Sequence, residues 1–139
     1  MKYKRFDNTI VLRLEVGEDI CEALLLLAEK EKITYASVSG IGATDDFTVG
    51  VFDLEKSDYD KFSFSGNHEI TSLAGNITEM NGKPYVHVHI NCAGKNGNIV
   101  GGHLISAKIS LTAEITVICA EGKVERRRDE NLKINLLEV

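Results

Sequence analysis

Three histidines have the type and spacing to form one chemical site: His87, His89 and His103. In the segment 85–90, histidines alternate with aliphatic residues, and alternate side chains of a strand share one face of the sheet. Both His87 and His89 are therefore expected on the same face. His103 follows a glycine-rich loop that can fold back and bring a third ring nitrogen to the same point. The pattern predicts a three-histidine cluster.

Such a cluster suits a divalent metal ion, and zinc in particular. Imidazole is a good ligand for zinc, and three protein ligands leave a fourth position for water or a substrate. A bound water of lowered pKa would support hydrolase or lyase chemistry on a small polar molecule. A His-x-His pair on a strand is also often an ordinary solvent-facing or hydrogen-bonded pair. Spacing alone leaves both interpretations open.

Other titratable residues are weaker candidates for this site. Cys92 has the strand parity of the aliphatic residues, so it is expected in the core. His68 is expected to be a polar strand-end residue, although it would approach the pair if its strand were the hairpin partner. Glu69 or Glu114 could transfer protons if the fold placed one beside a bound water.

The elements that would position these residues are mostly strands. Period-two alternation predicts a strand over 9–16, and a single helical stripe predicts a helix over 18–32. Asn81-Gly82 predicts a hairpin turn that leads into the histidine strand, because both central positions of a type I′ turn need positive φ. Further strands are expected over 35–44, 47–54, 69–79, 85–92, 99–105, 108–120, 124–128 and 133–139. Without regular β-α alternation, this order predicts an α+β domain with a largely antiparallel sheet.

Size and composition limit the remaining possibilities. The 139 residues fit one domain, 1–139, and 43% hydrophobic content supports a folded core. The net charge of −5 disfavours non-specific nucleic-acid binding. One basic run, Lys123 to Arg128, is better explained as a solvated edge or an intersubunit ion pair, with at least one arginine opposite the others. Three separated cysteines show no metal or redox spacing. No apolar leader follows the basic start, so a cytoplasmic location with no membrane association is expected.

Four segments together resemble the PPC domain, the plant and prokaryote conserved domain also called PCC. They are Val38–Ala43, Gly66–Gly75, His87–His89 and Gly101–Leu104, and the match extends over nearly the whole chain. The resemblance implies an antiparallel sheet with one main helix and short helical segments packed against it. It also implies a homotrimer and a metal unit formed by His87, His89 and His103.

The chain looks like the stand-alone prokaryotic form of that family. It has no Arg-Gly-Arg-Pro AT-hook, the element that would enter an A·T minor groove. Asn67 and His68 stand where plant members have Arg and Phe in a segment tied to partner interactions. We therefore expect a homotrimeric, zinc-binding protein of a family described as DNA-binding. The alternative is a metal-dependent hydrolase or lyase acting on a small molecule.

Overall fold

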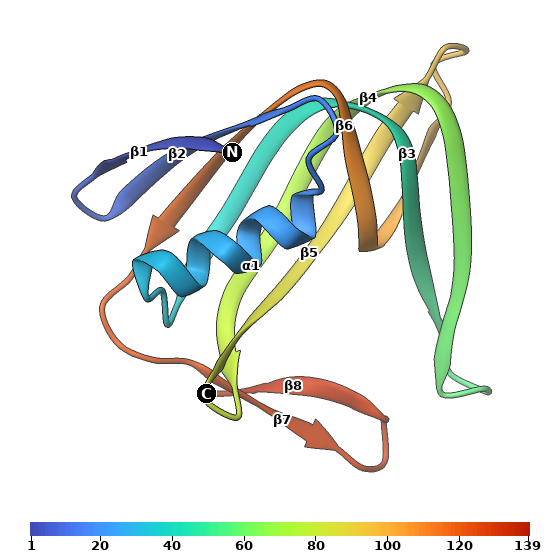
Figure 1. Cartoon of the computed structure of the whole chain (residues 1–139). Helices are drawn as coiled ribbons and strands as arrows, with labels where there is room; N and C mark the ends of the chain where they lie inside the picture. Colours follow the sequence, from blue (N-terminus) through green and yellow to red (C-terminus); the bar gives the residue numbers. More distant parts are fainter.

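A computed structural model describes all 139 residues, and strands dominate it (Figure 1). The expected α+β class with a largely antiparallel sheet is confirmed, since every extended strand pairing is antiparallel. The structure has one helix, α1, and the short helical segments expected beside it are not found. No helix has both the length and the apolar character needed to cross a membrane. The elements are β1 (Lys2–Phe6), β2 (Thr9–Glu15), α1 (Ile20–Glu31), β3 (Ala36–Asp53), β4 (Asp58–Met80), β5 (Lys83–Gly94), β6 (Ile99–Cys119), β7 (Glu125–Asp129) and β8 (Ile134–Glu138).

The helix forms where its periodicity predicts and packs against the curved sheet (Figure 1). Asp19 caps its first turn by accepting hydrogen bonds from the backbone N–H groups of Cys21 and Glu22. Lys32 ends the helix in the left-handed region at φ 52°. The predicted stripe is fully confirmed as the buried face, which comprises Ile20, Ala23, Leu24, Leu27 and Ala28.

Four strands close a ring of pairings that carries the histidines. β3 pairs with β4 and β6, and β5 also pairs with β4 and β6. β3 and β6 are each a single long strand, whereas the sequence predicts two shorter ones in each place. Register shifts near Gly42, Thr44 and Thr48 let these strands bend and remain paired. The residues at such bulges resemble those found between two strands, so the sequence predicts two strands where the structure has one.

One turn and one close approach between strands set the position of β5. Asn81 and Gly82 both have positive φ, 53° and 74°, so the predicted hairpin is confirmed. The pairing of β5 with β6 depends on Gly101. The sequence suggests that this glycine provides backbone freedom, but the structure gives a different reason. A Cβ atom at Gly101 would lie 2.2 Å from the carbonyl oxygen of Ile90. Glycine is needed there because β5 and β6 approach closely.

The chain ends in the β7–β8 hairpin, which lies at the edge of the sheet below β4 (Figure 1). A single parallel bridge, Glu79 to Glu125, joins the hairpin to β4. Side chains add to this joint, because Arg126 of β7 donates hydrogen bonds to Thr78 and Asn76 of β4. The hairpin is thereby held beside the β4–β5 pair, close to the histidines.

Candidate metal centre

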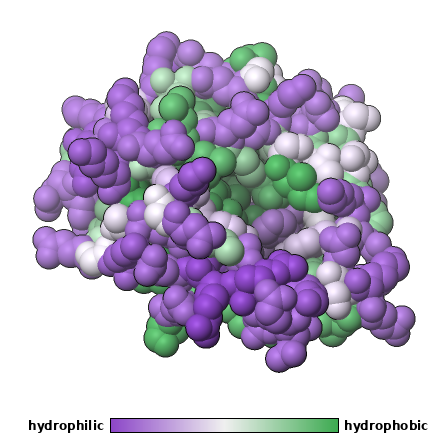
Figure 2. All heavy atoms as spheres, turned by 60° about the horizontal axis from the view of Figure 1, so that its bottom comes forward, coloured by the Kyte–Doolittle hydropathy of each residue, from purple (hydrophilic) through white to green (hydrophobic).

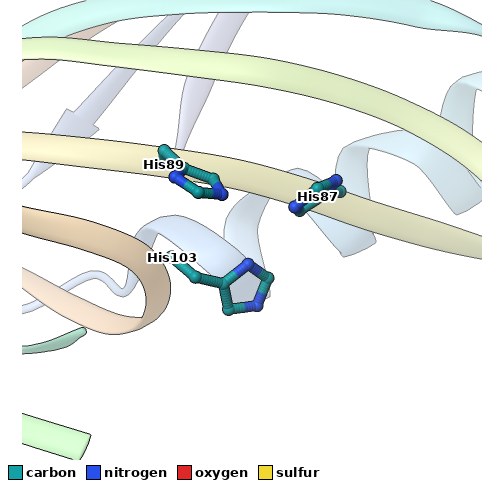
Figure 3. Close-up of side chains that lie close together, drawn as sticks. All are labelled: His87, His89 and His103. Carbon is teal, nitrogen blue, oxygen red and sulfur yellow. The ribbon is translucent and has the colours of Figure 1, made fainter. Parts of the chain in front are cut away.

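His87, His89 and His103 converge as the sequence predicts (Figure 3). β5 presents the first two on one face, and its antiparallel pairing with β6 places His103 directly opposite His89. The ring centroids lie 5.1 to 5.5 Å apart. One ring nitrogen from each residue lies within 4.8 Å of the other two. Imidazole nitrogens gathered in this way are a ligand type that zinc prefers in proteins.

Two features of the cluster fit a metal: the unpartnered ring nitrogen of His103 and the lowered pKa values of His87 and His103. Nδ1 of His103 is buried and has no hydrogen-bond partner, and a buried polar atom of this kind requires an explanation. Burial lowers the pKa of His87 to about 4, with a further effect from the charge of Arg126. Burial also lowers the pKa of His103, helped by His89 and Arg126. Both rings are therefore neutral near pH 7, the form that a metal requires.

Arg126 is a site residue that the sequence analysis missed. Its side chain is buried at 7% exposure, and its Nη2 lies 3.3 Å from Nδ1 of His87. The other contacts are Nε to Thr78 Oγ1 at 3.0 Å, Nη1 to the Asn135 carbonyl at 2.8 Å and Nη2 to Asn76 Oδ1 at 2.9 Å. Alternation in the basic run indicates that one arginine points away from the others, but no sequence signal shows which one reaches the histidines.

Two tyrosines complete the surroundings of the cluster. Tyr59 stacks on His103 with ring centroids 4.9 Å apart, and burial raises the pKa of its phenol. Gly50 leaves space for this ring, since a Cβ atom there would lie 2.7 Å from Tyr59. Tyr85 lies under the Arg126 guanidinium at 5.0 Å. Its position two residues before His87 puts it on the histidine face, a signal that was available in the sequence.

A pocket of about 600 Å³ is lined by five of the residues described above: Tyr59, Tyr85, His87, His103 and Arg126. Figure 2 brings the end of the molecule with β7 and β8 forward and shows a mostly hydrophilic face with apolar residues recessed at its centre. No aspartate or glutamate lines the pocket, whereas Arg126, Arg128 and Lys133 do. The remaining lining residues are Asn76, Ile134, Asn135, Leu136 and Leu137. The pocket therefore combines cationic and apolar side chains, many of them from the β7–β8 hairpin.

The weaker candidates lie elsewhere. Cys92 is fully buried in the hydrophobic core, as expected from its parity. His68 is on the hairpin partner β4, but it pairs with Gly94, and its Nδ1 contacts the Gly66 carbonyl instead of the cluster. Glu69 and Glu114 border a separate hollow on another part of the sheet. Neither glutamate is placed to transfer a proton in the histidine pocket.

Two of the four cationic residues in the basic run, Lys123 and Arg127, pair with neighbouring carboxylates, whereas Arg126 and Arg128 do not. Lys123 pairs with Glu79 and Glu125, and Arg127 pairs with Glu138. Arg127 points away from Arg126, so the predicted opposition within the run is confirmed. Lys123 and Arg127 therefore act in intramolecular ion pairs, where the sequence suggests a solvated edge or intersubunit pairs.

Comparisons with known proteins show that this fold is shared. A protein from Archaeoglobus fulgidus described as "metal-containing" is 34% identical, with 100% of both chains covered and a TM-score of 0.88. A PPC protein from Pyrococcus horikoshii is 29% identical, with 99% of this chain and 94% of that chain covered and a TM-score of 0.88. A Bacteroides thetaiotaomicron protein described as a "putative DNA binding protein" is 28% identical, with 99% and 96% covered and a TM-score of 0.96.

No curated protein matches the sequence. The sequence profile of the Plants and Prokaryotes Conserved (PCC) domain matches residues 1–121, which include all three histidines. The β7–β8 hairpin lies beyond the matched residues, although the structural relatives cover it. With most of the chain matched and the fold shared over its full length, the chain belongs to the PCC domain family.

Proposed function

We propose that the protein binds one zinc ion per chain through His87, His89 and His103. The unpartnered, buried Nδ1 of His103 within a converging imidazole set is the observation that carries this proposal. Neutral rings at His87 and His103 and the metal content of the Archaeoglobus relative support it. When bound, zinc supplies a Lewis acid with a free fourth position, the arrangement used for hydrolytic and lyase chemistry.

The protein's own residues would shape such chemistry. Tyr59 and Tyr85 give the pocket aromatic walls, and Arg126 adds a positive charge to its lining. A phenol is protonated near neutral pH, and burial raises the pKa of Tyr59 further above that range. A metal-dependent hydrolase or lyase acting on a small molecule is therefore the activity class that the site supports best.

Elemental analysis of untagged protein, purified without chelator or added metal, tests the metal proposal. We expect about one zinc per chain in the wild type and in His68→Ala, which removes the histidine outside the cluster. His103→Ala and the milder His103→Gln should lose the ion while retaining the wild-type circular dichroism spectrum. Metal-free wild type that also takes up no zinc when offered it would contradict the proposal.

DNA binding is the second candidate function, supported by the description of the Bacteroides relative. The net charge of −5 and the neutralisation of Lys123 and Arg127 oppose it. Fluorescence anisotropy with a labelled duplex, measured over a range of salt concentrations, distinguishes the two cases. Salt-dependent binding that weakens in Arg128→Gln would support a DNA-binding role. If no binding is detected at any salt concentration, the metal site remains the functional centre.

We also propose that the protein forms a homotrimer. Large apolar side chains are exposed on the single chain, among them Leu26 at 55%, Ile41 at 57% and Leu111 at 70%. Ile41 and Leu111 border the same hollow, and apolar side chains that are exposed together are typical of an interface between chains. Light scattering coupled to size-exclusion chromatography should give a mass near three times 15.3 kDa. A monomer mass would contradict this assembly.

A further inference from the structure

Arg126 is a buried cation with no carboxylate partner. It is the only charged residue in the buried set, and no ion pair of the molecule includes it. All of its hydrogen-bond acceptors are neutral: Thr78, Asn135, Asn76 and His87. Burying a positive charge without a negative one is unfavourable, so such a group normally has a functional partner.

The pocket beside Arg126 has the character of a site for an organic anion. Two more cationic side chains line it, Arg128 and Lys133, and no carboxylate does; Lys133 forms an ion pair with Glu130, which lies outside the lining. Leu136 and Leu137 add apolar surface to the pocket, and Leu137 is the direct register partner of Arg126 in the β7–β8 hairpin. A volume of about 600 Å³ is in the range of small-molecule sites. An anionic head and an apolar body would therefore each meet a matching surface.

The contact between Arg126 and His87 links this anion site to the metal centre. Guanidinium groups only donate, so Nδ1 of His87 must accept, and the proton of the neutral ring is then on Nε2. The single lone pair of His87 is therefore occupied by Arg126. A metal needs that lone pair, either at Nδ1 or after the proton has moved to Nδ1. In both cases the hydrogen bond from Arg126 to His87 must break.

Breaking this bond changes what Arg126 can bind. The four contacts use four of its five N–H groups and leave one free on Nη1. Loss of the His87 contact frees a second one, on Nη2. Arg126 then has one unused N–H on each terminal nitrogen, the number needed for a paired interaction with a planar carboxylate.

We propose that Arg126 binds the carboxylate of a small organic acid in this pocket, and that metal binding at His87 makes it available to do so. This inference rests on the proposed zinc site and adds the chemical class of its ligand. The carboxylate also supplies the negative charge that the pocket lacks. Metal and organic acid should therefore each strengthen the binding of the other.

Isothermal titration calorimetry with benzoate tests the proposal, with benzamide as a neutral probe of nearly the same shape. The full chain is titrated with zinc loaded and after chelator treatment. We expect benzoate to bind the zinc-loaded protein at least tenfold more tightly than the metal-free protein, and benzamide to bind at least tenfold more weakly than benzoate. Equal affinity for benzoate and benzamide would overturn the proposal, as would equal benzoate affinity of the zinc-loaded and the metal-free protein.

Variants of the basic run separate Arg126 from the metal. Arg126→Gln should lose at least tenfold in benzoate affinity, whereas Arg127→Gln, on the opposite face, should match the wild type. Arg126→Lys keeps the charge without the planar fork and should also bind benzoate more weakly. Benzoate affinity unchanged in both Arg126 variants would refute the role of this residue.

Zinc content measured on the same samples separates two kinds of failure. If the wild type contains no zinc, the proposed function fails. If wild type and Arg126→Gln both hold zinc but neither binds benzoate, only the carboxylate inference fails. Tighter binding of phenyl phosphate than of benzoate would replace the carboxylate by a phosphate and overturn the inference as stated.

Discussion

Replacing Gly101 with alanine should damage the fold and the metal centre together. The added Cβ would lie 2.2 Å from the Ile90 carbonyl oxygen and 2.4 Å from Asn91 Oδ1, whereas ordinary contact begins at 3.4 Å. β5 and β6 must therefore separate locally by about 1 Å. Overpacking of this kind lowers the free energy of unfolding by about 1–3 kcal/mol. Because β5 and β6 carry the three histidines, we also expect zinc affinity to fall by about 10- to 100-fold, as when the support of metal ligands is disturbed.

Two measurements on the purified variants check this prediction. Urea unfolding of the metal-free proteins gives the stability change, and zinc titration against a competing chelator gives the affinity change. Gly94→Ala is the matched control, because its Cβ would meet neighbours at 3.4 Å or more and its φ is not positive. If Gly101→Ala were as stable as Gly94→Ala and bound zinc equally well, the close-approach argument would be wrong.

Three further predictions test the core, the histidines and the thiols. Leu27→Ala removes a fully buried side chain and should lower the free energy of unfolding by about 2–5 kcal/mol in urea, whereas Leu26→Ala, 55% exposed, should change it by less than about 1 kcal/mol. In chelator-treated protein the melting temperature should fall as the pH drops from 6.5 to 4. The reason is that the unfolded chain takes up a proton in this range, whereas folded His87, with its pKa lowered to about 4, does not. A melting temperature that does not change with pH would contradict this, as would an unchanged pH dependence in His87→Gln. Burial raises the pKa of Cys92 to about 12, so iodoacetamide at pH 8 should modify this thiol only after unfolding, and rapid labelling of the folded protein would count against its core position.

The sequence predicts the histidine cluster because strand alternation and one turn determine most of its geometry. Period two places His87 and His89 on one face, and positive φ at Asn81 and Gly82 fixes the hairpin before them. The position of His103 opposite His89 needs the β5–β6 register, which the sequence suggests only through its glycine-rich loop. The helix and its buried face follow directly from their period.

The remaining parts of the site depend on tertiary packing that local patterns do not encode. Arg126 reaches His87 because β7 pairs through a single bridge with β4, which is far away in the sequence. A long-range pairing of this kind leaves no local signal. Tyr59 reaches His103 because Gly50 leaves space for its ring. The sequence around the bulges in β3 and β6 looks like the end of a strand. The partners that keep these strands paired through the bulges are far along the chain, so the local sequence does not show them.

The central claim is that His87, His89 and His103 form a metal centre, and anomalous diffraction from a zinc-grown crystal tests it most directly. The account predicts one strong anomalous peak per chain, about 2.0–2.1 Å from one ring nitrogen of each of the three histidines. It also predicts that the peak disappears in His103→Gln. A histidine cluster with no peak, or a zinc ion bound elsewhere on the chain, would contradict the account.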